Sequence, residues 1–162
     1  MSAKKLLLPF LFLAVLLFQQ CGTDAFQKDL LNYINVELPK VASLESEALG
    51  AYSSVVGSNY TTDSAMYMKI TETVIPKYQQ FTGQLEAITP ATDELKKVHA
   101  EYITAAKEQL KAFNLITDAL LKQDANEIKE ANAELSKAVT QIESWKTDLL
   151  DMCKKHNIVI EK

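Results

Sequence analysis

The chain has 162 residues, which is enough for one domain, and only 4 Gly and 4 Pro, which favours long helices over loops. All 17 basic residues are Lys, whereas Arg is the usual residue for bidentate contacts to phosphate and guanine. Together with a formal net charge of −4, the absence of Arg argues against a nucleic-acid partner.

The first twenty residues have the features of a signal peptide. Lys4 and Lys5 give a short positive region, and an almost purely apolar run follows at residues 6–18. That run is long enough for the core of a signal peptide and too short to cross a bilayer core of about 30 Å. We therefore predict that residues 1–20 are a processing segment outside the folded domain.

Cys21 follows directly after this segment, preceded by Gln19 and Gln20. Here the chain resembles a bacterial lipoprotein precursor, in which such a cysteine becomes the lipidated first residue after cleavage. The resemblance covers residues 1–21 and implies a palmitate-type lipid anchor on Cys21. It also implies a location in a bacterial cell envelope, facing the periplasm or the cell exterior. Gln19 and Gln20 are larger than the residues usual at these positions, so a plainly secreted or uncleaved chain is the alternative.

The charge of the mature chain indicates how it would meet a membrane. Cleavage before Cys21 would leave 142 residues with all 21 acidic residues and 15 lysines, a net charge of −6. Negative charge of that size opposes close contact with an anionic membrane surface. We therefore expect the lipid to hold the protein to the membrane, with residues 21–25 as a short tether.

Two amphipathic helices are expected in the first half of the mature chain. The first covers residues 26–56 and contains Pro39, which should kink the helix without ending it because the apolar periodicity resumes afterwards. The segment 57–63 is the clearest loop. A second helix, expected to begin near Asp63 or Ser64 and to run to about Ile88, contains Pro76 and is expected to be kinked in the same way.

A third helix is expected to begin with Thr89 as its cap and Pro90 in its first turn, and to end near Lys122. The connection to the last helix is very short, and short connections make neighbouring helices antiparallel. We predict an all-α, antiparallel, up-down-up-down four-helix bundle over residues 26–157. Residues 158–162 form a C-terminal tail. Its apolar residues Ile158, Val159 and Ile160 are expected to fold back on the bundle, and the alternative is that they remain available for a partner.

The fourth helix carries the most regular pattern in the chain. Asp124 is expected to cap its start, with Glu127 reaching back in a reciprocal cap, and Asn157 is expected to stop it. About 31 residues at 1.5 Å each make a rod of about 46 Å. Its apolar seam needs partner helices to cover it. The seam residues are Ile128, Ala131, Leu135, Ala138, Ile142, Trp145, Leu149 and Met152.

Metal sites and cofactors are not indicated. Neither of the two histidines belongs to a Glu-x-x-His motif of the kind that di-iron bundles use, and there is no Cys-x-x-Cys-His haem motif. Cys153 and His156 form a weak candidate pair, but two ligands make only half of a zinc site. We expect no metal and no cofactor. His99 follows Val98, which belongs to the apolar face of the third helix, and is expected at a helix boundary and partly solvated.

Motifs for catalysis are not found either. The chain has no Gly-x-Ser-x-Gly and no glycine-rich phosphate loop. The acidic residues of the fourth helix follow an outer, solvated face. Tyrosines at helical spacing are expected in the core with their hydroxyls at its rim. The acidic residues of that face are Glu127, Glu130 and Glu134, and the tyrosines are Tyr67, Tyr78 and Tyr102. We therefore expect that the chain is not an enzyme.

The second cysteine offers a test of the lipoprotein interpretation. In an up-down bundle the start of the first helix and the end of the fourth lie at the same end, so Cys21 and Cys153 could form a disulfide in an oxidising compartment. Lipidation of Cys21 would consume its thiol and forbid that bridge. The two hypotheses therefore exclude each other.

The function that we expect is non-catalytic: a helical interaction or scaffold module that presents a surface to another envelope protein. The main alternative is a carrier that binds a small apolar ligand between the helices kinked at Pro39 and Pro76. A metal-binding bundle using Cys153 and His156 is the third and weakest hypothesis.

Overall fold

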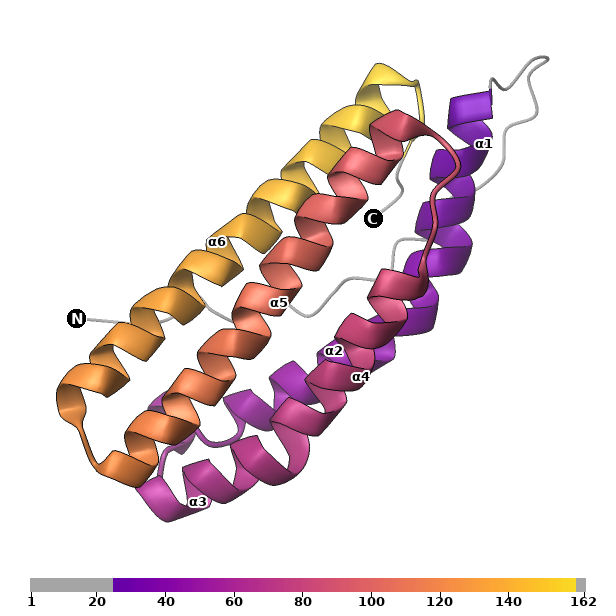
Figure 1. Ribbon diagram of the computed structural model, residues 1–162. Coiled ribbons are helices and arrows are strands. Elements are labelled where there is room, and N and C mark those ends of the chain that lie inside the picture. The colour runs from indigo at the N-terminus through magenta and orange to yellow at the C-terminus, as the bar shows by residue number, and fades with distance from the viewer. Residues whose placement is uncertain (1–24, 160–162) are drawn as a thin grey trace.

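The computed structural model describes residues 25–159, and every regular element in that range is a helix (Figure 1). Four long helical segments lie side by side and run alternately up and down the molecule. This confirms the predicted all-α four-helix bundle. The segments are α1 (Ala25–Asn32), η1 (Tyr33–Glu37) and α2 (Leu38–Ser53); then α3 (Asp63–Lys69), η3 (Ile70–Val74) and α4 (Ile75–Ala87); then α5 (Asp93–Lys122); and finally α6 (Ala125–Lys155).

Pro39 and Pro76 lie inside continuous helical segments, as predicted, and each comes just after a five-residue π-helical turn. Proline has no N–H and crowds the carbonyl of the preceding turn, which strains an ordinary α-helix. A widened π-turn absorbs this misfit by lengthening the local hydrogen-bonded ring. In each segment the amide before the proline donates to the carbonyl five residues back, Leu38 to Tyr33 and Ile75 to Ile70.

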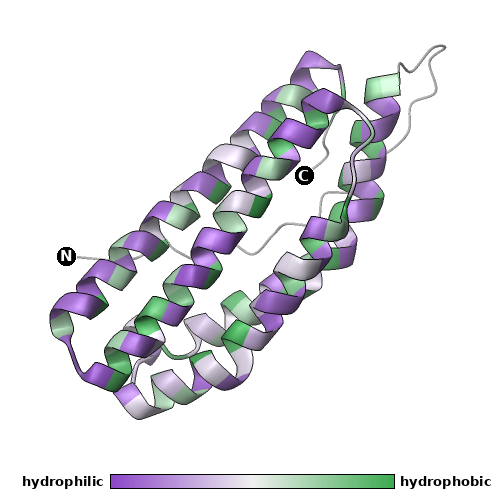
Figure 2. Ribbon diagram, viewed as in Figure 1, coloured by the Kyte–Doolittle hydropathy of each residue, from purple (hydrophilic) through white to green (hydrophobic). Residues whose placement is uncertain are grey.

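The core follows the whole length of the bundle. Every predicted seam residue of α6 is buried except Ile128, which is half-buried, so the predicted inner face of this helix is confirmed. Hydrophilic residues cover the outer faces of α5 and α6 (Figure 2). Aromatic residues supply the largest side chains of the core. Its largest fully buried side chains are Trp145, Tyr33, Tyr78, Tyr102, Phe81 and Phe113.

The predicted start of the third helix is wrong. Residues 88–92 are not helical, and α5 begins at Asp93 rather than at Pro90. The reason is a carboxylate from the first segment. Asp29 accepts hydrogen bonds from the Ala91 amide (3.0 Å), the Thr92 amide (2.8 Å) and the Thr92 hydroxyl (2.6 Å). This contact across more than sixty residues of sequence sets where α5 begins, and it ties the starts of α1 and α5 together.

The predicted ends of α6 are largely confirmed. Asp124 caps the helix, since its carboxylate accepts from the amides of Asn126 (2.8 Å) and Glu127 (3.2 Å). The reciprocal half of the cap is wrong, because the Glu127 carboxylate instead accepts from the Lys122 ammonium. At the other end Asn157 takes the left-handed conformation that stops the helix. Ile158 then folds back against the core.

Gln123, between α5 and α6, also has a left-handed backbone (φ 55). A side chain with a Cβ adopts this conformation at a cost of about 1–2 kcal/mol, whereas glycine adopts it freely. We expect Gln123→Gly to raise the free energy of unfolding by roughly 1 kcal/mol, as measured by urea denaturation. Lys122→Gly, one residue earlier and inside the helix, is the control and should lower stability. Equal losses in both variants would contradict this account of the turn.

Candidate functional site

A carboxylate lies in the centre of the bundle. Glu45 of α2 is only 4% exposed, and it accepts a hydrogen bond from the Tyr102 hydroxyl of α5 at 2.9 Å. The indole of Trp145, from α6, stacks flat against the Tyr102 ring, with centroids 3.7 Å apart and 11° between the planes. These three residues, one from each of three helices, are called the buried cluster below. An acidic side chain is seldom buried to this extent.

Burial raises the pKa of Glu45 to about 7, because the ionised carboxylate is taken out of water. The Tyr102 hydroxyl and the Lys146 ammonium favour ionisation and partly oppose this effect, while Glu143 adds to it. The carboxyl group therefore changes its charge near neutral pH. Since Tyr102 is itself fully buried and its pKa is raised, it acts only as a hydrogen-bond donor to Glu45.

Two further polar pairs lie in the core. The Tyr33 hydroxyl forms a 2.9 Å hydrogen bond with Nδ1 of His99, and the Tyr78 hydroxyl donates to Oε1 of Gln109 at 2.8 Å. The prediction that His99 is partly solvated is wrong, because it is 4% exposed. Desolvation lowers the pKa of His99, opposed in part by the carbonyls of Leu85 and Ile88. The hydroxyls of Tyr78 and Tyr102 lie inside the core. The prediction that these tyrosine hydroxyls lie at the rim of the core is therefore wrong.

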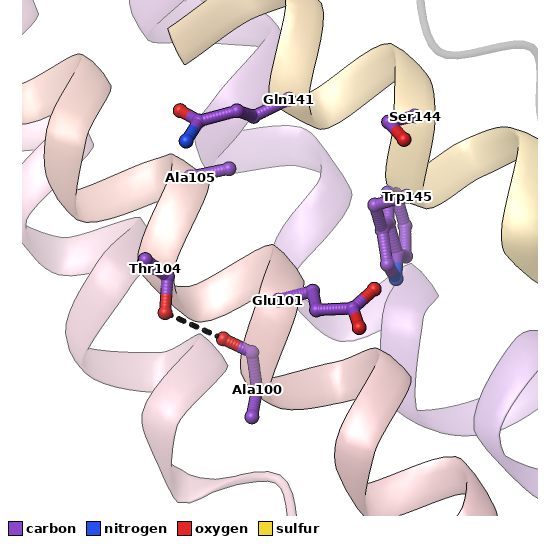
Figure 3. A pocket seen from close by; sticks show the side chains of 7 residues that line it. All are labelled: Ala100, Glu101, Thr104, Ala105, Gln141, Ser144 and Trp145. Atoms are coloured by element: carbon purple, nitrogen blue, oxygen red, sulfur yellow. Dashed lines mark hydrogen bonds between the residues drawn. The ribbon is translucent and has the colours of Figure 1, made fainter.

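An open groove of ≈ 360 Å³ lies beside the buried cluster, between α5 and α6. Figure 3 shows the carboxylate of Glu101 directed towards the indole ring of Trp145 on its wall. Glu45 and Tyr102 do not line the groove, so a molecule in it would touch the cluster only through Trp145. The other lining residues are mostly small, which leaves the space of the groove between the two helices. They are Ala100, Thr104, Ala105, Gln141 and Ser144.

The predicted weak metal pair lies at the end of α6. Cys153 is buried, and burial raises the pKa of its thiol to about 11, which opposes formation of the thiolate that metals bind. The His156 ring packs on Phe26 with centroids 4.1 Å apart. Within residues 25–159 no three His, Cys, Asp or Glu side chains come together as a possible metal site.

The predicted lipid-attachment residue, Cys21, lies outside the described residues, as does the possible Cys21–Cys153 bridge. The bundle begins at Ala25, four residues later. The end of α6 lies beside the start of α1: besides the contact of Phe26 with His156, the Gln27 side-chain amide donates to the His156 carbonyl at 2.8 Å. The predicted proximity of these two ends is therefore confirmed for the described part of the chain.

Comparisons with known protein families, with curated proteins and with solved structures find no match to this chain. Within residues 25–159, no helix combines the length and the apolar character that a membrane crossing requires.

Sequence reasoning missed the buried cluster, although a signal for it was present. Glu45 stands four residues after Val41 and three before Ala48, which are both buried seam positions. The same spacing places His99 between Leu95 and Tyr102. A titratable residue at seam spacing indicates a buried polar contact, even when the residues next to it in sequence are polar.

Proposed function

We propose that this chain is a non-catalytic lipoprotein of a bacterial cell envelope, anchored through Cys21, whose helical bundle presents a surface to another envelope protein. The observation that carries the proposal is the short distance between the signal-peptide-like segment with its cysteine and the fold. Only three residues separate Cys21 from Ala25, the first residue of α1. A lipid on Cys21 would therefore hold the bundle directly at the membrane.

Support for a partner-binding role comes from the opposite end of the molecule. There α3 and the last turn of α5 lie together, far from the start of α1 (Figure 1). Three large apolar side chains are exposed in this region: Tyr60 (47%), Met68 (51%) and Leu121 (64%). We call these three residues the distal tip. Exposed apolar side chains at the end far from the anchor are suited to contact with a second protein.

The carrier alternative has weaker support. It requires space between the helices that contain Pro39 and Pro76, whereas Leu38, next to Pro39, and Val74, two residues before Pro76, are buried in the core. The ≈ 360 Å³ groove is formed by α5 and α6 alone and is open to solvent. A ligand there would gain little of the enclosure that small-molecule sites provide.

The anchor is tested by detergent-phase partitioning and intact mass, with protein from the native host. The wild type is expected to enter the detergent phase with the mass of residues 21–162 plus a diacylglyceryl group. The Cys21→Ala variant is expected to stay in the aqueous phase, because it has no thiol to lipidate. A wild type that stays aqueous would overturn the lipoprotein proposal and make the Cys21–Cys153 bridge the next hypothesis to test.

The partner is tested in the same strains with a photo-reactive residue in place of Met68, and with one in place of Thr140, an exposed residue at the middle of α6, as the control. We expect a defined cross-linked protein from position 68 of the anchored chain and none from position 140. Loss of that product in the Cys21→Ala background would show that capture depends on the membrane. Equal labelling from both positions would contradict an interaction surface at the distal tip.

A further inference from the structure

Two buried polar atoms on the wall of the groove between α5 and α6 have no hydrogen-bond partner within residues 25–159. They are the indole Nε1 of Trp145 and the side-chain Oε1 of Gln141. Trp145 is only 1% exposed, so its N–H is shielded from bulk water as well. Because a buried polar group almost always has a partner, these two atoms point to a ligand that supplies one.

A carboxylate lies beside the indole N–H. Glu101 is exposed and forms no ion pair with any lysine of the described part of the chain. In Figure 3 its carboxylate is directed towards the edge of the Trp145 ring that carries the nitrogen. Gln141 stands one helical turn away from Trp145 along α6. One end of the groove thus offers a hydrogen-bond donor next to a carboxylate, and the other end offers an acceptor.

These three groups match the beginning of a peptide chain. The ammonium group of a free N-terminus suits the Glu101 carboxylate, and the carbonyl oxygen of the first residue suits the N–H of Trp145. An amide N–H further along the peptide would donate to Oε1 of Gln141. An extended chain advances about 3.3 Å per residue, so two or three residues cover a helical turn of about 5.4 Å.

We propose that the groove between α5 and α6 binds the first two or three residues of a peptide with a free N-terminus. Ala100 and Ala105 on its wall leave room for a peptide backbone with small side chains. The volume of ≈ 360 Å³ lies within the range of about 300–1,000 Å³ that is usual for small-ligand sites. The open side of the groove gives an apolar ligand little enclosure, but it lets the rest of a peptide continue into solvent. This site does not depend on the lipid anchor.

The indole N–H signal of Trp145 tests this site directly. Since Trp145 is the only tryptophan, a proton–nitrogen correlation spectrum of the labelled protein contains one indole signal. Titration with Ala-Ala-Ala-amide at pH 6.5 and constant ionic strength should shift this signal saturably, with the millimolar affinity expected of so small a ligand. Acetyl-Ala-Ala-Ala-amide has no ammonium group, so it should bind about tenfold more weakly or worse.

Two variants identify the groups that hold the peptide. Glu101→Gln removes the charge at an exposed position and should erase the preference for the free over the acetylated peptide. Gln141→Leu removes the distant acceptor, so the tripeptide should bind no more tightly than Ala-amide, which is too short to reach it. Glu130→Gln changes an exposed carboxylate of α6 outside the groove and should bind like the wild type.

Three results would overturn the site. The first is the absence of a saturable shift of the indole signal with the free tripeptide. The second is equal binding of the free and the acetylated peptide by the wild type, because the ammonium group would then contribute nothing. The third is a preference for the free peptide that is as strong in Glu101→Gln as in the wild type.

Discussion

At pH 8 the Glu45→Gln variant is expected to be more stable than the wild type by about 2–3 kcal/mol. The folded-state pKa of Glu45 is about 7, above the ordinary value of 4.5. A carboxyl group whose pKa is raised by folding favours the native state only while it is protonated. Its contribution is thus fully present below pH 4.5 and is lost as the pH rises towards 7, at a cost of roughly 3 kcal/mol. Glutamine cannot ionise, and its carbonyl can still accept from Tyr102.

The measurement is urea denaturation at intervals from pH 4 to pH 8, followed by the fluorescence of Trp145, the only tryptophan. Because Trp145 stacks on Tyr102 in the buried cluster, its emission reports the state of this part of the core. The wild type should lose stability between pH 4.5 and 7, and Glu45→Gln should lose much less. Glu130→Gln, which removes an exposed carboxylate from α6, is the control and should follow the wild type. Parallel pH profiles for wild type and Glu45→Gln would refute the assignment.

Much of the fold could be predicted because it depends on local pattern. The seam of α6, its Asp124 cap and its Asn157 stop are all encoded within a few residues of where they act. The continuity of the helices through Pro39 and Pro76 also followed from periodicity. The π-turns before Pro39 and Pro76 could not be predicted in this way. Apolar spacing alone does not distinguish a kinked α-helix from a helix in which one turn is wider by one residue.

The candidate site was missed because its contacts are long-range. Each partner in the buried cluster stands in a separate helix, so no local motif joins Glu45 to Tyr102. Glutamate is usually exposed, whereas the spacing of Glu45 from the apolar residues of its helix indicates a buried position, and Glu45 is buried. The prediction of where α5 begins was wrong for the same reason. Thr89 and Pro90 form a plausible local cap, but Asp29, distant in sequence, supplies the hydrogen bonds at residues 91 and 92.

Asp29→Ala is expected to lower the free energy of unfolding by roughly 2–4 kcal/mol. The substitution removes three hydrogen bonds to a carboxylate, each of which is of the stronger, charge-assisted kind. The half-buried amide of Thr92 would also lose its partner. Asp29→Asn keeps one acceptor oxygen and should fall between the wild type and the alanine variant. Urea denaturation at pH 7 measures all three.

The pH dependence of this loss distinguishes a capping carboxylate from simple packing. Burial raises the pKa of Asp29, but the hydrogen bonds from Ala91 and Thr92, together with Lys96, outweigh burial and hold it below the ordinary value of 3.8. The stabilisation is thus present above pH 4 and is lost as the pH falls below it, so wild type and Asp29→Ala should converge in acid. Asp93→Ala removes an exposed carboxylate from the same helix start and should change stability little. If Asp29→Ala kept its full deficit at pH 2, the carboxylate would not be what holds the starts of α1 and α5 together.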